Sequence, residues 1–181
     1  MQIKKFEIEG PLLIIPTVYS DSRGYFFESF SKRLFESNGI NYDFVQDNQS
    51  LSGKGTLRGL HFQSPPFAQG KLVRVTSGSV IDIIVDIRKS SPTYGKSISI
   101  NISENNYYQL WVPQGFAHGF LVLEDNTIFQ YKCTDYYNKE AEGGILFNDP
   151  DLNLNWEISS PIISDKDLKL PYFKDFVSPF I

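Results

Sequence analysis

Two histidines are the side chains of this protein best suited to proton chemistry near neutral pH. His61 lies in the segment Leu-Arg-Gly-Leu-His-Phe-Gln (57–63) and His118 in Gly-Phe-Ala-His-Gly-Phe (115–120); the 181 residues contain no other histidine. Histidine has an ordinary pKa of roughly 6.5, so it takes or gives a proton at this pH without special help. We therefore expect an acid–base site around one or both of them.

A metal site is the alternative use of two histidines. Small β-barrels bind iron, manganese or nickel through histidines and a carboxylate, and His61 and His118 could supply two such ligands. The closely spaced His-x-His pair typical of these sites is missing, however, and Lys71 nearby would repel a cation. The single Cys133 excludes an internal disulfide and a cysteine-based zinc site.

The spacing of strand and turn signals predicts the elements that must position these groups. Aromatic and β-branched residues are abundant, with 15 Phe and 10 Tyr, and such side chains favour strands. Short turns at fairly even intervals are typical of a sandwich or barrel. The predicted strands cover residues 71–76, 80–87, 97–102, 109–112, 120–123 and 127–133, and residues 124–126 are expected to close a hairpin between the last two.

Outside these strands the chain is expected to be peripheral. Residues 31–38, followed by Gly39, form the one clear helix signal, with a serine at the start and a glycine where a left-handed residue is favoured. Residues from about 149 to 181 contain four prolines and few strand signals, so we expect them to wrap the barrel. We expect a single domain over residues 1–181.

Strand parity points a lysine and a tyrosine inward. Lys71 shares a face with Val73, and Tyr131 shares one with Phe129. Because apolar residues mark the inward face, the ammonium and the phenol are predicted to border a cavity able to hold a small ligand.

Arg58 and His61 do not fit simple alternation. They are three residues apart and would face opposite sides of a regular strand, so both reach one ligand only if the strand bulges, for which Gly59 is the obvious place. The alternative leaves Arg58 on the surface, paired with a carboxylate.

The overall charge restricts the partners. A net charge of -4 argues against a nucleic-acid binder, which needs a basic face, so an anionic ligand would have to meet locally clustered Lys and Arg. The first residues lack the apolar region of a signal peptide, and no run approaches the roughly 20 apolar residues of a membrane span. These features predict a cytoplasmic protein that binds no nucleic acid and no membrane.

Several long motifs resemble one family. They are residues 57–63, Ala-Gln-Gly-Lys-Leu-Val-Arg (68–74), Val-Asp-Ile-Arg-Lys-Ser-Ser-Pro-Thr (85–93) and Pro-Gln-Gly-Phe-Ala-His-Gly-Phe (113–120), with the shorter 21–24, 46–48 and 131–137. Together, in order and over nearly the whole chain, they resemble the dTDP-4-dehydrorhamnose 3,5-epimerase family of cupin-fold sugar epimerases.

The resemblance implies a mostly β, cupin-like barrel (jelly roll) with a few short peripheral helices and no metal or organic cofactor. It also implies epimerisation at C3 and/or C5 of a nucleotide-linked 4-keto-6-deoxy sugar, by default dTDP-4-dehydro-6-deoxyglucose to dTDP-4-dehydrorhamnose. His61 would be the base, held by Asp167, with Lys71 stabilising the enolate and Tyr131 returning the proton. By composition alone, Asp167 belongs to a solvated loop.

The resemblance further implies substrate contacts from Arg23, Glu28, Gln46, Asn48, Arg58, His118, Tyr137, Glu142 and Lys166. It implies a homodimer in which the N-terminal segment, about residues 1–50, is exchanged, so that Arg23 and Glu28 reach the neighbouring site. Inversion at C3 only or C5 only, and a GDP-linked 4-keto heptose as substrate, stay open at this point. A metal-dependent cupin enzyme and a non-catalytic sugar-nucleotide binding module are the rival classes.

Overall fold

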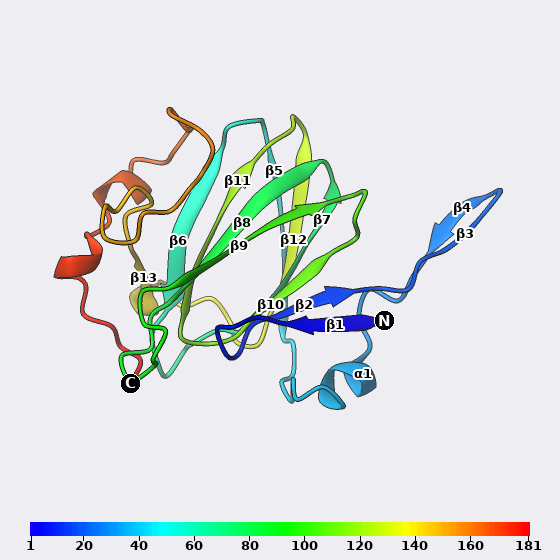
Figure 1. The fold of residues 1–181 in the computed structure, drawn as a ribbon, viewed down its shortest axis with the longest axis horizontal. Helices are drawn as coiled ribbons and strands as arrows, with labels where there is room; N and C mark the ends of the chain where they lie inside the picture. Colours follow the sequence, from blue (N-terminus) through cyan, green and yellow to red (C-terminus); the bar gives the residue numbers. More distant parts are fainter.

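Two antiparallel sheets face each other and form the barrel of this computed structural model, which describes residues 1–181 (Figure 1). The six-stranded sheet contains, in spatial order, β1 (Gln2–Lys5), β2 (Leu12–Ile15), β10 (Gln109–Val112), β7 (Lys71–Ser77), β12 (Thr127–Cys133) and β5 (Gln46–Ser52). The five-stranded sheet contains β13 (Glu142–Gly144), β6 (Leu57–Gln63), β11 (Phe116–Val122), β8 (Ser79–Asp86) and β9 (Ser97–Ser103). The expected cupin-like jelly roll is confirmed.

The helical elements are short and peripheral. They are α1 (Lys32–Glu36) and the three 3-10 turns η1 (Lys139–Ala141), η2 (Asp167–Lys169) and η3 (Phe173–Asp175). The helix expected over residues 31–38 is shorter than predicted, because the chain leaves α1 at Ser37, although Ser31 does occupy its N-cap. No helix is long and apolar enough to cross a membrane.

A small hairpin of β3 (Tyr19–Asp21) and β4 (Gly24–Phe26) projects away from the barrel (Figure 1). Three of its aromatic side chains, those of Tyr19, Tyr25 and Phe26, are more than half exposed. Exposed apolar patches of this kind are more typical of interaction surfaces than of the surface of a single chain.

One predicted pairing is wrong. Residues 124–126 do not close a hairpin, because β11 belongs to the five-stranded sheet and β12 to the six-stranded sheet. The turn instead carries the chain across the barrel, and Thr127 Oγ1 donates to the carbonyl of Glu124 at 2.8 Å within it. A strand, a turn and a second strand form the same sequence pattern whether or not the two strands pair.

The main core lies between the two sheets. Its largest fully buried side chain is Phe129 of β12, which stacks on Phe120 of β11 with ring centroids 4.0 Å apart. A second cluster lies on the outer face of the five-stranded sheet, where residues after Gly144, including Ile145 and Trp156, cover β6 and β8. The barrel is thus packed on both faces of this sheet.

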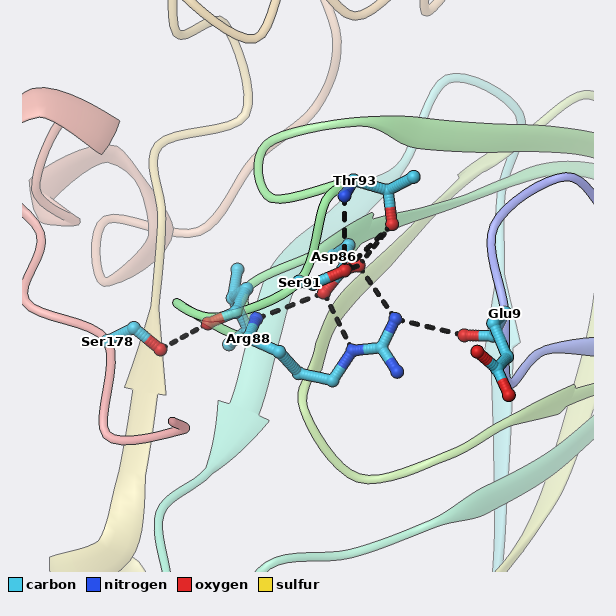
Figure 2. Close-up of polar contacts among 7 residues, drawn as sticks. Glu9, Asp86, Arg88, Ser91, Thr93 and Ser178 are labelled. Atoms are coloured by element: carbon cyan, nitrogen blue, oxygen red, sulfur yellow. Dashed lines mark hydrogen bonds and ion pairs between the residues drawn. The ribbon is translucent and has the colours of Figure 1, made fainter.

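The loop that begins at Asp86 connects segments near both ends of the chain to the barrel. Asp86, at the end of β8, accepts hydrogen bonds from the side chains of Arg88, Ser91 and Thr93 (Figure 2). Arg88 Nη2 also donates to the carbonyl of Glu9 at 2.9 Å, and Ser178 donates to the carbonyl of Ile87 (Figure 2). The segments before β2 and after η3 are therefore fixed to one loop of the barrel.

Candidate active site

A cavity of two lobes lies in the barrel. The larger lobe, about 530 Å³, is bordered by Arg58, His118 and Lys166, and the smaller, about 300 Å³, by Gln46, Asn48, Tyr137 and Glu142. His61, Lys71 and Tyr131 border both lobes. An imidazole, an amine and a phenol therefore meet where the lobes join.

His61 is held by a carboxylate from the distant C-terminal part of the chain. Its Nε2 lies 2.7 Å from Asp167 Oδ1, and Asp167 Oδ2 accepts from the backbone N–H of Gly59 at 3.4 Å. Burial raises the pKa of Asp167, but the hydrogen bonds from His61, Gly59 and Ser164 outweigh it and hold that pKa below its usual value. Asp167 is therefore a carboxylate at neutral pH, with His61 as its direct partner.

A bulge in β6 brings Arg58 and His61 to the same cavity, as the sequence predicted. The pairing of β6 with β11 shifts its register between His118 and Phe120. Gly59 has φ of +134°, and a Cβ on it would lie 2.5 Å from the Cα of Gly119. Only glycine allows the two strands to approach so closely here.

Lys71 and Tyr131 extend from neighbouring strands, β7 and β12, with the orientation that parity predicted. The Lys71 Nζ lies 5.9 Å from the centre of the Tyr131 ring. Burial lowers the pKa of Lys71, while negative charge at Cys133, Asp82 and Glu142 acts to raise it. Burial raises the pKa of Tyr131, so its phenol keeps its proton at neutral pH.

His118 lies directly opposite His61, across the β6–β11 pair, and has its own carboxylate. Its Nε2 is 2.8 Å from Asp82 Oδ2, and both side chains are buried. The sequence analysis missed Asp82; its signal was an acidic residue with two apolar residues before it and three after it in β8. No group of three or more His, Cys, Asp or Glu side chains is arranged to hold a metal ion.

A polar network borders the smaller lobe. Glu142 Oε2 lies 2.5 Å from Lys166 Nζ and accepts from the Tyr137 hydroxyl at 2.9 Å. Gln46 accepts from the Tyr137 N–H at 3.0 Å and donates to Asn48 at 3.0 Å. Burial raises the pKa of Glu142, but the bonds from Lys166 and Tyr137 outweigh it and lower that pKa. Five residues named from the sequence thus form one network.

Two predicted contacts lie outside the cavity of this chain. Arg23, at the tip of the β3–β4 hairpin, pairs with Asp21 at 2.5 Å. Glu28 borders a different pocket, next to Met1. Arg58, by contrast, borders the larger lobe and donates to Ser52 at 3.2 Å.

The fold and the cavity define a cupin-like barrel with an acid–base site. The chain belongs to the dTDP-4-dehydrorhamnose 3,5-epimerase family, a family of isomerases whose model matches residues 5–175. A dTDP-4-dehydrorhamnose 3,5-epimerase from Shigella flexneri is 51% identical over 97% of each chain. The crystal structure of the Elizabethkingia anophelis epimerase has a TM-score of 0.92 at 46% identity, covering 97% of each chain.

A third relative was solved with a sugar nucleotide. The structure of a dTDP-6-deoxy-D-glucose-3,5-epimerase from Legionella pneumophila, in complex with dTDP-4-keto-L-rhamnose, has a TM-score of 0.93 at 44% identity. The similarity covers 97% of this chain and 94% of that one.

Proposed function

We propose that the protein epimerises C3 and C5 of a dTDP-linked 4-keto-6-deoxy sugar. The observation that carries the proposal is the junction of the two lobes, where the His61–Asp167 pair, Lys71 and Tyr131 face one space. Family membership and the ligand of the Legionella relative support the substrate class.

His61 is the proposed base. Asp167 accepts the hydrogen on Nε2, which leaves Nδ1 free to take the proton from the carbon next to the C4 ketone. Removal of that proton moves the electron pair onto the ketone oxygen and forms an enolate. A positioned base of this kind contributes about 10²- to 10⁴-fold to a proton transfer.

Lys71 stabilises that enolate. Its ammonium is fixed next to the junction before the reaction begins, so no reorganisation is needed when negative charge develops on the C4 oxygen. Loss of a comparable oxyanion donor costs about 2.7 to 4 kcal/mol in the transition state.

Tyr131 returns a proton from the opposite face of the sugar. Its raised pKa keeps the phenol protonated, as an acid requires. Protonation from the side opposite His61 inverts the carbon, whereas return of the proton by His61 only exchanges hydrogen with solvent. Once His61 has released its proton to solvent and Tyr131 has taken one up from solvent, the same cycle at the second carbon gives the doubly inverted product.

The remaining residues bind the nucleotide. Arg58 and Lys166 border the larger lobe and supply the positive charge that a diphosphate needs, while Gln46, Asn48, Tyr137, Glu142 and His118 hold the other polar groups. Arginine suits a diphosphate because its planar fork bonds two oxygens at once.

A second copy completes the proposed site. The exposed β3–β4 hairpin with Arg23, and the residues directly after it with Glu28, reach the cavity of a second copy; both lie within residues 1–50 of the single domain. The functional unit is then a homodimer with exchanged N-terminal segments.

The test is hydrogen exchange in heavy water. The protein is incubated with dTDP- and GDP-linked 4-keto sugars, each made in situ by a dehydratase, and deuterium at C3 and C5 is followed by mass spectrometry and NMR. Two deuterons in the dTDP sugar are expected; one deuteron would mean a single-site epimerase. Absence of incorporation from every substrate would overturn the proposal and favour a binding module.

A further inference from the structure

Asp82 is a buried charged group on the inner face of the barrel that the proposed mechanism leaves unused. It lies on β8 with its side chain on the inner face, because Val80 and Ile84, two residues to either side, both pack in the core between the sheets. Asp82 is completely buried. Its Oδ2 meets His118, but Oδ1 has no hydrogen-bond partner in the protein. An unpaired buried carboxylate oxygen is costly and calls for an explanation.

Lys71 lies across the same interior. It is on β7, in the sheet opposite β8 (Figure 1), and Val73 and Val75 on its face pack in the same core cluster as Val80 and Ile84. No carboxylate forms a direct ion pair with the Lys71 ammonium. A buried ammonium in this position needs compensating negative charge to stay protonated.

Three groups next to Lys71 can carry negative charge, and two of them are accounted for. Burial raises the pKa of Cys133, so this thiol is neutral at physiological pH. Glu142 is already paired with Lys166 at 2.5 Å. Asp167, which borders the same lobe, is already paired with His61 at 2.7 Å, and Arg58 and Lys166, which also border it, are cationic side chains. Asp82 is the remaining anion.

We propose that Asp82 is a positioning residue: its carboxylate keeps the Lys71 ammonium charged and orients His118 by accepting its Nε2 hydrogen. The proposal rests on the proposed function, because it assigns a cause to the charge that Lys71 uses there. One carboxylate then serves both, with Oδ2 on the histidine and the charge of the group acting on the lysine across the core. His118, with Nε2 occupied, presents Nδ1 to the ligand.

The first test needs no activity. NMR of protein labelled with ¹⁵N-lysine, with the Lys71 signal assigned by its absence in Lys71→Met, follows protonation of this side chain against pH. In the unaltered protein Lys71 is expected to be an ammonium at pH 7, and in Asp82→Asn it loses its proton at lower pH. A neutral Lys71 at pH 7 in the unaltered protein, or the same titration in both proteins, would overturn the proposal.

The second test uses the reaction. Asp82→Asn keeps the size of the side chain and an oxygen for His118, so KM should change little. Because the negative charge is lost, kcat should fall. The alkaline limb of the plot of rate against pH should move to lower pH. At high pH the loss should approach the roughly 10²-fold or greater loss expected for Lys71→Met. In the Lys71→Met background, Asp82→Asn should cause no further loss; an additive loss would contradict the proposal.

A second pair of variants guards against misfolding. If Asp82→Asn does not fold, Asp82→Glu and Asp82→Gln replace it. These two side chains have the same size, but only Glu carries the negative charge. Only Asp82→Gln should shift the Lys71 titration. If the unaltered protein shows the expected titration yet exchanges no hydrogen with any 4-keto sugar, the proposed function fails while the role of Asp82 stands.

Discussion

The proposed base depends on which nitrogen of His61 is free. Asp167 bonds Nε2, so the reactive nitrogen is Nδ1. In Asp167→Asn the amide group can donate to Nε2 and leave the hydrogen on Nδ1, which blocks the base without changing the shape of the site. We expect kcat/KM to fall about 10²-fold or more, with unchanged affinity for dTDP. Deuterium incorporation and calorimetric titration with dTDP measure the two quantities.

His61→Ala is the matched control, because it removes the base itself. Deuterium incorporation at C3 and C5 should then be lost to a similar or greater extent than in Asp167→Asn. Full incorporation by His61→Ala would remove His61 from its proposed role. Full activity of Asp167→Asn alone would show that the carboxylate does not set the tautomer.

Substitution of Tyr131 should affect hydrogen exchange with solvent and inversion of the carbon differently. In Tyr131→Phe the proposed base remains, so deprotonation continues and His61 returns the proton to the original face. We expect deuterium incorporation to persist at least in part, while formation of the inverted sugar is suppressed. NMR of the product, which reports deuterium content and configuration together, distinguishes the two results. Unaltered inversion would exclude Tyr131 as the proton donor.

At the scale of elements, the alternation of apolar and polar residues predicted which face of a strand a side chain occupies better than it predicted which strands pair. The apolar strands β7, β8, β9, β10 and β12 were located from their side chains, and parity oriented Lys71 and Tyr131 correctly. β5 was missed because this edge strand reads Gln-Asp-Asn-Gln-Ser-Leu-Ser and shows no apolar period. The hairpin predicted at residues 124–126 is wrong because the local sequence does not indicate which sheet a strand joins.

The candidate site shows the same limit. Asp167 and His61 are separated by 106 positions in the chain, so only the resemblance connected them. Asp82 was overlooked because its partner, His118, lies on another strand. A side chain's type and face can be inferred locally, but a contact between distant segments depends on the assembled sheets.

The loop after β8 predicts how stability changes with pH. Burial raises the pKa of Asp86, but the bonds from Arg88, Ser91 and Thr93 outweigh it and bring the pKa from 3.8 to about 2. A folded-state pKa below the unfolded value stabilises the fold above pH 4, and that contribution is lost as the pH falls from about 4 to about 2. It amounts to about 2 kcal/mol at neutral pH.

Asp86→Asn should therefore lower the free energy of unfolding by about 2 kcal/mol at pH 7. Chemical denaturation of both proteins between pH 7 and pH 2 measures the difference. It should shrink as the pH approaches 2, since the carboxyl group of the unaltered protein becomes neutral there. A difference that stays constant with pH would mean that Asp86 acts through shape and not through charge.

At the scale of the whole molecule, the exposed hairpin predicts sites shared between two copies. If Arg23 serves the neighbouring cavity, a heterodimer of one Arg23→Ala chain and one His61→Ala chain contains one intact site, made from His61 of the first chain and Arg23 of the second. Differently tagged chains, co-expressed and purified through both tags, give this heterodimer. We expect about half the activity of the unaltered dimer, because one of two equivalent sites survives.

The matched control places both substitutions in one chain and pairs it with an unaltered chain. With exchanged hairpins, each site of this heterodimer lacks either Arg23 or His61, so its activity should fall to the level of the single-variant homodimers. Without exchange, the unaltered chain would keep a complete site and the order of the two activities would be reversed. The same two substitutions, placed in different chains or in one chain, thus give opposite rankings for the two architectures, and hydrogen exchange at C3 and C5 measures the ranking.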